Sequence, residues 1–124
     1  MVYIPIDAEW YLAEIVERFN VQEEPSSTVQ VNFVLVRAAT PKKAFEKATA
    51  FGKVGKEPYT NSDGKIVTPE YLGLRNLHVI YEPLEDGSEI VYERYEDVVE
   101  GDAMRMVKQK HELNAFRGTT LRVD

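Results

Sequence analysis

The sequence predicts an α+β fold: an antiparallel, mostly meander β-sheet with one helix packed on a face and a C-terminal helix. Three observations predict this class. Residues 28–38 alternate polar and apolar side chains, as a strand does, and an amphipathic helix begins after Thr40. The third observation is Asp63-Gly64, which lies between two further strand-like segments. It is a strong signal for a tight turn because glycine accepts positive φ.

The segment 8–19 permits two interpretations. Its apolar residues fall at helical spacing behind Asp7, which can serve as an N-cap, and periodicity alone therefore favours a helix. The same segment is rich in aromatic and β-branched residues and precedes a strong strand, which favours a strand paired with the next one. Residues 22–27, with a proline and two serines, form a loop between the two segments.

The clearest strand covers residues 28–38. Apolar residues occupy every second position, with Gln30 and Asn32 between them. From Val34 onward both faces are apolar, which predicts a central strand that is covered on at least one face at that end. The alternating apolar residues are Val29, Val31, Phe33 and Leu35.

A helix is expected at 40–52. Thr40 can cap the free amides, and Pro41 suits the first helical position. Gly52 and Gly55 are candidate ends of the helix. Its apolar stripe predicts that it packs on one face of the sheet. The stripe consists of Ala44, Phe45, Ala48 and Phe51.

The elements after this helix are a short hairpin and two longer strands. The hairpin covers 56–70, and Pro69 limits its second arm to a sheet edge or to an early end. The longer strands are expected at 72–82 and 89–96, and the turn at 83–88 joins them.

The chain has 124 residues, a length that favours a single domain over 1–124. A C-terminal helix is expected at 102–116 and a tail at 117–124. The N-terminus lacks the basic region, long apolar run and cleavage site of a signal peptide, and no stretch reaches the ~18 apolar residues of a membrane span. We therefore expect a cytoplasmic protein.

Composition disfavours several functional classes. Fifteen basic and 21 acidic residues give a net charge of −6, which disfavours binding to nucleic acid or to an anionic membrane. The absence of cysteine excludes disulfides, thiol catalysis and cysteine zinc sites. No nucleophile elbow, phosphate loop or helical zinc pair occurs. We assign no catalytic, cofactor-binding or metal-binding residue and expect no cofactor.

Acidic residues concentrate between Glu82 and Asp102. Nine acids and one base, Arg94, give this acidic segment a net charge of −8. One interpretation is that these charges protect an edge hairpin from pairing with other chains. A second is a surface for a basic partner, and a third is metal or acid–base chemistry. The candidate partner-binding residues are Glu85, Asp86, Glu89, Glu96 and Asp97.

The favoured function is a small non-enzymatic binding protein, of inhibitor or immunity type, whose acidic segment meets a basic protein partner. A thin apolar stripe on the C-terminal helix and exposed aromatic residues indicate a homodimer. The alternative is a small enzyme that uses carboxylates with His78 or a tyrosine. A third hypothesis is nucleic-acid binding by the lysines on and after the first helix, Lys42, Lys43, Lys47, Lys53 and Lys56.

Four stretches, in this order and spacing, resemble a bacterial domain-of-unknown-function family of short uncharacterised proteins, DUF4288. They are Trp10–Val16, Val31–Arg37 with the helix start at Thr40-Pro41, Tyr59–Gly64, and Gly73–Gly87. The resemblance covers about residues 10–97. It implies that residues 10–19 form a strand paired with the next one, and this interpretation replaces the helix. It implies no activity and no catalytic residue.

Overall fold

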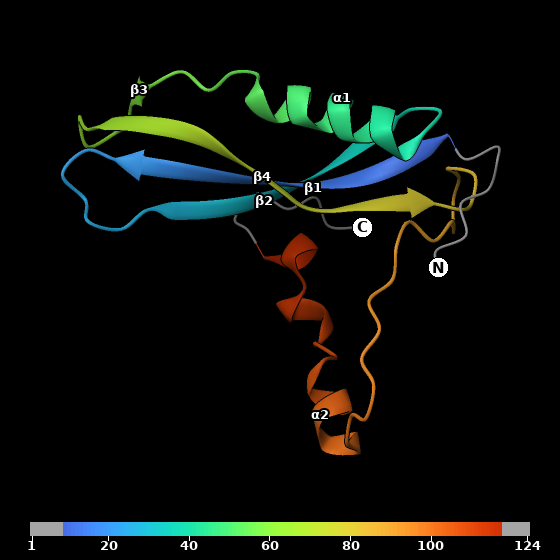
Figure 1. Ribbon diagram of the computed structural model, residues 1–124. Coiled ribbons are helices and arrows are strands. Elements are labelled where there is room, and N and C mark those ends of the chain that lie inside the picture. Colours follow the sequence, from blue (N-terminus) through green and yellow to red (C-terminus); the bar gives the residue numbers. More distant parts are fainter. Residues whose placement is uncertain (1–8, 118–124) are drawn as a thin grey trace. The chain divides into compact units, whose positions relative to one another are not determined.

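The computed structural model describes residues 9–117. The chain divides into two compact units, Met1–Tyr92 and Glu93–Asp124. The first unit holds the whole sheet and the long helix (Figure 1). The N-terminal residues examined for a signal peptide and the tail after Arg117 lie outside the described residues. The expectation of a single domain over 1–124 stays a prediction.

The sheet has four antiparallel strands in the order β2-β1-β4-β3. The strands are β1 (Trp10–Val21), β2 (Thr28–Arg37), β3 (Tyr59–Thr60) and β4 (Ile66–Ile80). The predicted α+β class is therefore confirmed, and so is the strand at 10–19. β1 is one of the two inner strands and is paired along both sides, with β2 on one side and with β4 on the other.

Helix α1 (Pro41–Lys53) begins where the sequence predicts it. The Thr40 side chain accepts a hydrogen bond from the Lys43 backbone N–H at 3.2 Å, and Pro41 stands at the first helical position. This cap satisfies one of the amides that a helix start leaves without an intrahelical partner.

Of the predicted stripe on α1, only the two alanines are buried against the sheet. Ala44 and Ala48 are buried, and so is Gly52 outside the predicted stripe, whereas Phe45 and Phe51 are exposed. Small side chains allow the helix axis to approach the strands closely. The core under α1 is formed by Tyr11, Ala13 and Ile15 of β1, Val36 of β2, and Ala44 and Ala48 of the helix.

The sheet face opposite α1, here called the second face, carries the other half of each strand's side chains. Alternation along the paired strands assigns residues to it. They are Trp10, Leu12, Glu14 and Val16 of β1, Val29, Val31, Phe33 and Leu35 of β2, and Asn76, His78 and Ile80 of β4.

The prediction of a central strand at 28–38 is wrong, because β2 is an edge strand. Its alternating set, which includes Phe33 and Leu35, lies on the second face, whereas Val34 and Val36 face the helix. Period-two alternation shows that a strand has two distinct faces. It does not show which face the helix covers or whether a second neighbour pairs with the strand.

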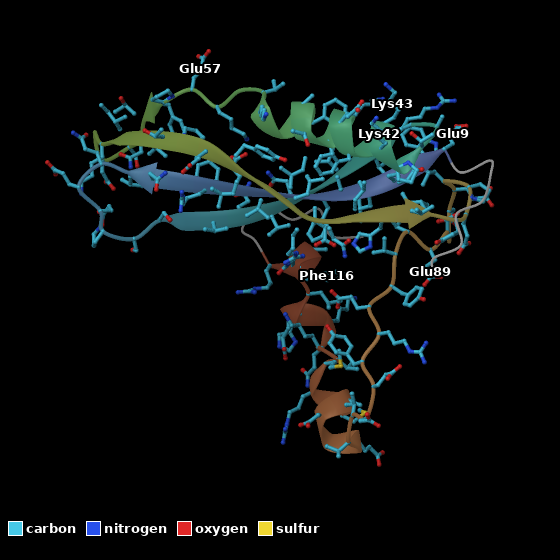
Figure 2. All side chains as sticks on the ribbon, in the orientation of Figure 1. Glu9, Lys42, Lys43, Glu57, Glu89 and Phe116 are labelled. Atoms are coloured by element: carbon cyan, nitrogen blue, oxygen red, sulfur yellow. The ribbon has the colours of Figure 1, made fainter. Side chains whose placement is uncertain are left out.

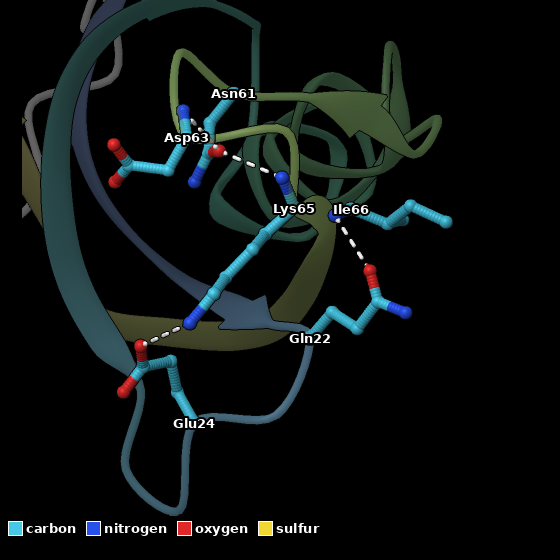
Figure 3. Close-up of polar contacts among 6 residues, drawn as sticks. All are labelled: Gln22, Glu24, Asn61, Asp63, Lys65 and Ile66. Carbon is cyan, nitrogen blue, oxygen red and sulfur yellow. Dashed lines mark hydrogen bonds and ion pairs between the residues drawn. The ribbon is translucent and has the colours of Figure 1, made fainter.

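The hairpin turn at Asp63-Gly64 forms as predicted, with Gly64 at φ +77°. The Asn61 side chain accepts hydrogen bonds from the backbone N–H groups of Asp63 and Lys65, each at 3.0 Å (Figure 3). The second arm of this hairpin and the strand expected at 72–82 are one continuous strand, β4. Pro69 fits within β4, because β3 has already ended there and the strand has a partner on one side only.

The return strand expected at 89–96 is wrong: residues 81–99 contain no helix or strand. A strand needs a neighbour, and the dense carboxylates of this segment oppose pairing.

The helix expected at 102–116 is shorter than predicted. It comprises α2 (Glu100–Arg105) and the 3₁₀ turns Lys110–Glu112 and Asn114–Phe116, as expected where a thin apolar stripe stabilises little helix.

Candidate functional site

The polar cluster at the centre of the second face is built around Glu14. This carboxylate is only 8% exposed. Its Oε1 accepts a hydrogen bond from Arg75 Nε at 2.5 Å, and its Oε2 lies 2.5 Å from His78 Nε2. Both carboxylate oxygens are thus held, as a buried charge requires.

Arg75 reaches Glu14 because of an irregularity in strand pairing. The β1–β4 register shifts between Glu14 and Ile15, so that Glu14 opposes Asn76 while Ile15 opposes Leu74. Arg75 is the extra residue at this bulge and has no Cα partner on β1. A bulge redirects a side chain out of the regular alternation. Here it places the guanidinium beside Glu14, 5.9 Å from the centre of the Phe33 ring.

The surroundings of the cluster are largely apolar. Glu14 pairs with Phe33 across the β1–β2 register, and His78 pairs with Leu12. The hydrogen bond from His78 lowers the pKa of Glu14. Burial opposes this change, and Arg75 adds to the lowering through its hydrogen bond and its charge.

The lowered pKa of Glu14 makes stability depend on pH. In the unfolded chain the carboxyl has its ordinary pKa near 4.5, so its stabilising contribution is fully present above that pH. As pH falls through the lower folded pKa, the contribution is lost. We expect the difference in unfolding free energy between wild type and Glu14→Gln to shrink below pH 4.5, as measured by urea unfolding from pH 7 to 3. A difference that stays constant over this range would contradict the assignment.

Sequence reasoning singled out His78 but missed Glu14 and Arg75. The available signal was a lone acid on a strand face between apolar residues, since Leu12 and Val16 lie on the same face of β1. Chemically, Glu14 and His78 resemble a carboxylate that orients an imidazole. The hydrogen bonds of the cluster within residues 9–117 bring no hydroxyl or second acid to it.

Tyr11 and Tyr95 have surroundings that do not include His78. Tyr11 lies in the core under α1, where burial raises the pKa of its phenol and its hydroxyl has no hydrogen-bond partner among the described residues. The Tyr95 hydroxyl donates to Glu93 Oε2 at 2.9 Å, and this hydrogen bond raises the pKa of Tyr95.

The five candidate acids of the acidic segment are all exposed, and the structure divides them between the two units. Glu85, Asp86 and Glu89 belong to the first unit, and Glu96 and Asp97 to the second. Of these five, Glu96 alone forms an ion pair within the described chain, with Arg94 at 3.3 Å. Figure 2 labels Glu89, whose side chain projects from the loop after β4.

Several acids of the first unit outside the acidic segment have basic partners. Glu24 pairs with Lys65 at 3.0 Å (Figure 3), and the buried Glu17 pairs with Lys56. Further pairs join Glu9 to Arg37, Glu70 to Arg18 and Glu46 to Lys43. The lack of an ion pair within the described residues therefore distinguishes Glu85, Asp86, Glu89 and Asp97 from these acids of the first unit.

The predicted lysine set is partly engaged inside the fold. Lys47 Nζ donates to the Arg37 carbonyl at 2.6 Å, and Lys56 and Lys43 form the ion pairs described above. Lys42 and Lys43 lie at the start of α1 and point outward (Figure 2). Of the described residues, no group of three or more His, Asp or Glu is arranged to hold a metal ion. No helix in the described range is long and apolar enough to cross a membrane.

The model of the domain of unknown function DUF4288 matches residues 10–92. The chain belongs to this family. The match runs from the first residue of β1 to the last residue of the first compact unit, so the DUF4288 domain includes the sheet, α1 and the Glu14 cluster. No curated protein and no solved structure matches the chain.

Proposed function

We propose that this DUF4288 protein is a non-enzymatic protein-binding module of the bacterial cytoplasm. Its acidic segment would meet a basic protein partner, as the surface of an inhibitor or immunity protein does. The candidate residues are Glu85, Asp86, Glu89, Glu96 and Asp97.

The observation that supports this proposal is the absence of internal neutralisation. Glu85, Asp86 and Glu89 are exposed and form no ion pair with the rest of the described chain, whereas acids such as Glu14 and Glu17 have basic partners. Such an uncompensated cluster produces a negative potential that accelerates encounters with a basic surface.

The competing interpretation of these charges is weakened by the fold. Charges that guard an edge hairpin need a hairpin, and residues 89–96 form no strand. The acids stand on an irregular connection, closed at its start by a turn in which the Ser88 N–H donates to the Glu85 carbonyl at 3.0 Å. Loops of this kind more often carry binding residues than sheet protection.

The test compares two variants with equal changes in charge. One neutralises Glu85, Asp86 and Glu89. The control neutralises Glu23, Glu57 and Asp63, which are also exposed and have no ion pair within the described range. Each set uses Glu→Gln and Asp→Asn.

Both variants and wild type are used to capture partners from a lysate of the native host, and association rates are measured with the partner identified. We expect the first variant alone to slow association at low salt, by about tenfold or more. A third variant, Glu96→Gln with Asp97→Asn, assigns the contribution of the second unit. Identical partners and rates for all variants would refute the role of the acidic segment.

The alternative function is an enzyme that uses His78. The one contact that favours it is the hydrogen bond between His78 Nε2 and Glu14, since a carboxylate can orient an imidazole for proton transfer. The hydrogen bonds of the cluster within the described chain bring it no nucleophile, and its neighbours across the strands include Leu12 and Phe33. These surroundings support a structural role for the cluster better than a catalytic one.

A further inference from the structure

The outer edge of β2 is a long backbone surface available for pairing. β2 has ten residues and only one neighbour, β1. Its outer edge makes no backbone–backbone hydrogen bond to any other residue between 9 and 117, although at its end the Arg37 carbonyl accepts a hydrogen bond from the Lys47 side chain. An edge strand of this length presents a row of unpaired N–H and C=O groups, and another strand can bind to it.

β2 lacks the features that normally prevent such pairing. From Thr28 to Val36 there is no charged residue and no proline. Its pairing with β1 runs without a register shift, so no bulge twists the edge away. The opposite edge of the sheet differs, because β3 has only two residues. The edge of β2 is therefore the one suited to strand addition.

The side chains of β2 on the second face add an apolar surface beside this edge. Phe33 is 61% exposed, Val29 is 54% exposed and Leu35 is 46% exposed. These side chains alternate along one face of the strand. A partner strand with apolar side chains at the same spacing would cover them through cross-strand pairs.

We propose that a second copy of this chain occupies the edge, so that two β2 strands pair antiparallel about a two-fold axis at Asn32. This register gives maximal overlap of the uncharged run from Thr28 to Val36. It places Phe33 opposite Val31 of the second copy, and Leu35 opposite Val29 of the second copy. The two sheets become one eight-stranded sheet, with apolar residues of both copies adjoining on the second face.

The paired segment carries no charge that would repel a second copy at this edge. The −6 net charge of each chain opposes association in general, yet none of it lies on the paired segment. Arg37, the one charged residue of β2, would face Ser27 of the second copy. Residual repulsion between the rest of the two chains is screened by salt, so the dimer should become stronger as ionic strength rises.

Cross-linking tests the register directly, because the chain has no cysteine of its own. We expect Asn32→Cys to form a disulfide-linked dimer under mild oxidation, since directly opposed strand residues have Cα atoms close enough for a disulfide. Ser62→Cys, in the turn before Asp63-Gly64, should remain uncross-linked.

Light scattering tests the association itself. Wild type should have twice the 14.2 kDa chain mass at high micromolar concentration, and Phe33→Glu and Leu35→Lys should each weaken the dimer at least about tenfold. Phe51→Glu, on the exposed side of α1, is the matched control and should remain dimeric. Circular dichroism confirms that each variant folds.

A monomeric wild type would overturn the proposal. So would a dimer that survives both β2 substitutions while Asn32→Cys fails to cross-link, and so would an extended peptide of another protein bound along β2. None of these outcomes affects the acidic-segment proposal, which depends on different residues.

Discussion

Replacing His78 by leucine is expected to lower the free energy of unfolding by about 2–4 kcal/mol. Glu14 is 8% exposed, and the substitution removes the partner of its Oε2 while the charge stays buried. Arg75 still holds Oε1, but its own side chain is more than half exposed and cannot replace the imidazole. Urea unfolding at pH 7 measures the effect.

A double-mutant cycle separates lost pairing from lost packing. When Glu14→Leu is added to His78→Leu, no buried charge is left and the two leucines extend the apolar surroundings formed by Leu12 and Phe33. We expect the double variant to be more stable than His78→Leu alone, since replacing both partners costs less than orphaning one. Losses that simply add would show that the two side chains do not act as a pair.

Gly52→Ala is expected to destabilise the protein by about 1–3 kcal/mol, although alanine is the better helix former by about 1 kcal/mol. A Cβ at position 52 would overlap Cε1 of Tyr71 and lie 3.2 Å from Cγ2 of Ile15. Ile15 is buried and Tyr71 packs against the core, so neither can move without disturbing the contact between α1 and the sheet.

The matched control is Gly101→Ala in α2, where a Cβ would meet no atom of the described residues within 4 Å apart from its chain neighbours and its own helix backbone. This variant should be neutral or slightly stabilising, because only helix propensity changes. Thermal unfolding is measured for both variants. It is also measured for the double variant that combines Tyr71→Ala with Gly52→Ala. The steric account fails if Gly52→Ala is as stable as wild type, or if removing the Tyr71 ring does not reduce its cost.

The sequence predicts correctly those features that depend on hydrogen bonds between residues close together in the chain. The cap at Thr40 and the turn at Asp63-Gly64 formed as expected, because their hydrogen bonds join residues within four positions. The strand at 10–19 was harder, since its apolar pattern also fits a helix. The family resemblance decided it, and the physical reason is that β1 is buried on both faces, so its apolar residues need not alternate.

Pairing between distant segments was the part that sequence reasoning missed. Whether β2 lies at an edge depends on where residues 66–80 dock, and nothing within β2 records this. The same holds for the Glu14 cluster, which joins residues 61 and 64 positions apart through a bulge. In the acidic segment, the alternation of apolar and polar residues predicts a return strand at 89–96. Without a neighbouring strand to pair with, this alternation does not produce one.

The position of β1 in the sheet also determines when folding can finish. Its pairing with β2 is local, and the two strands can form a hairpin as soon as both have left the ribosome. Its other side must wait for β4, since Trp10 pairs with Ile80, 70 residues later in the chain. Such long-range closure raises contact order and slows folding. During synthesis the newly made hairpin therefore exposes the strand that becomes the most buried one, and this interval is when a chaperone would matter most.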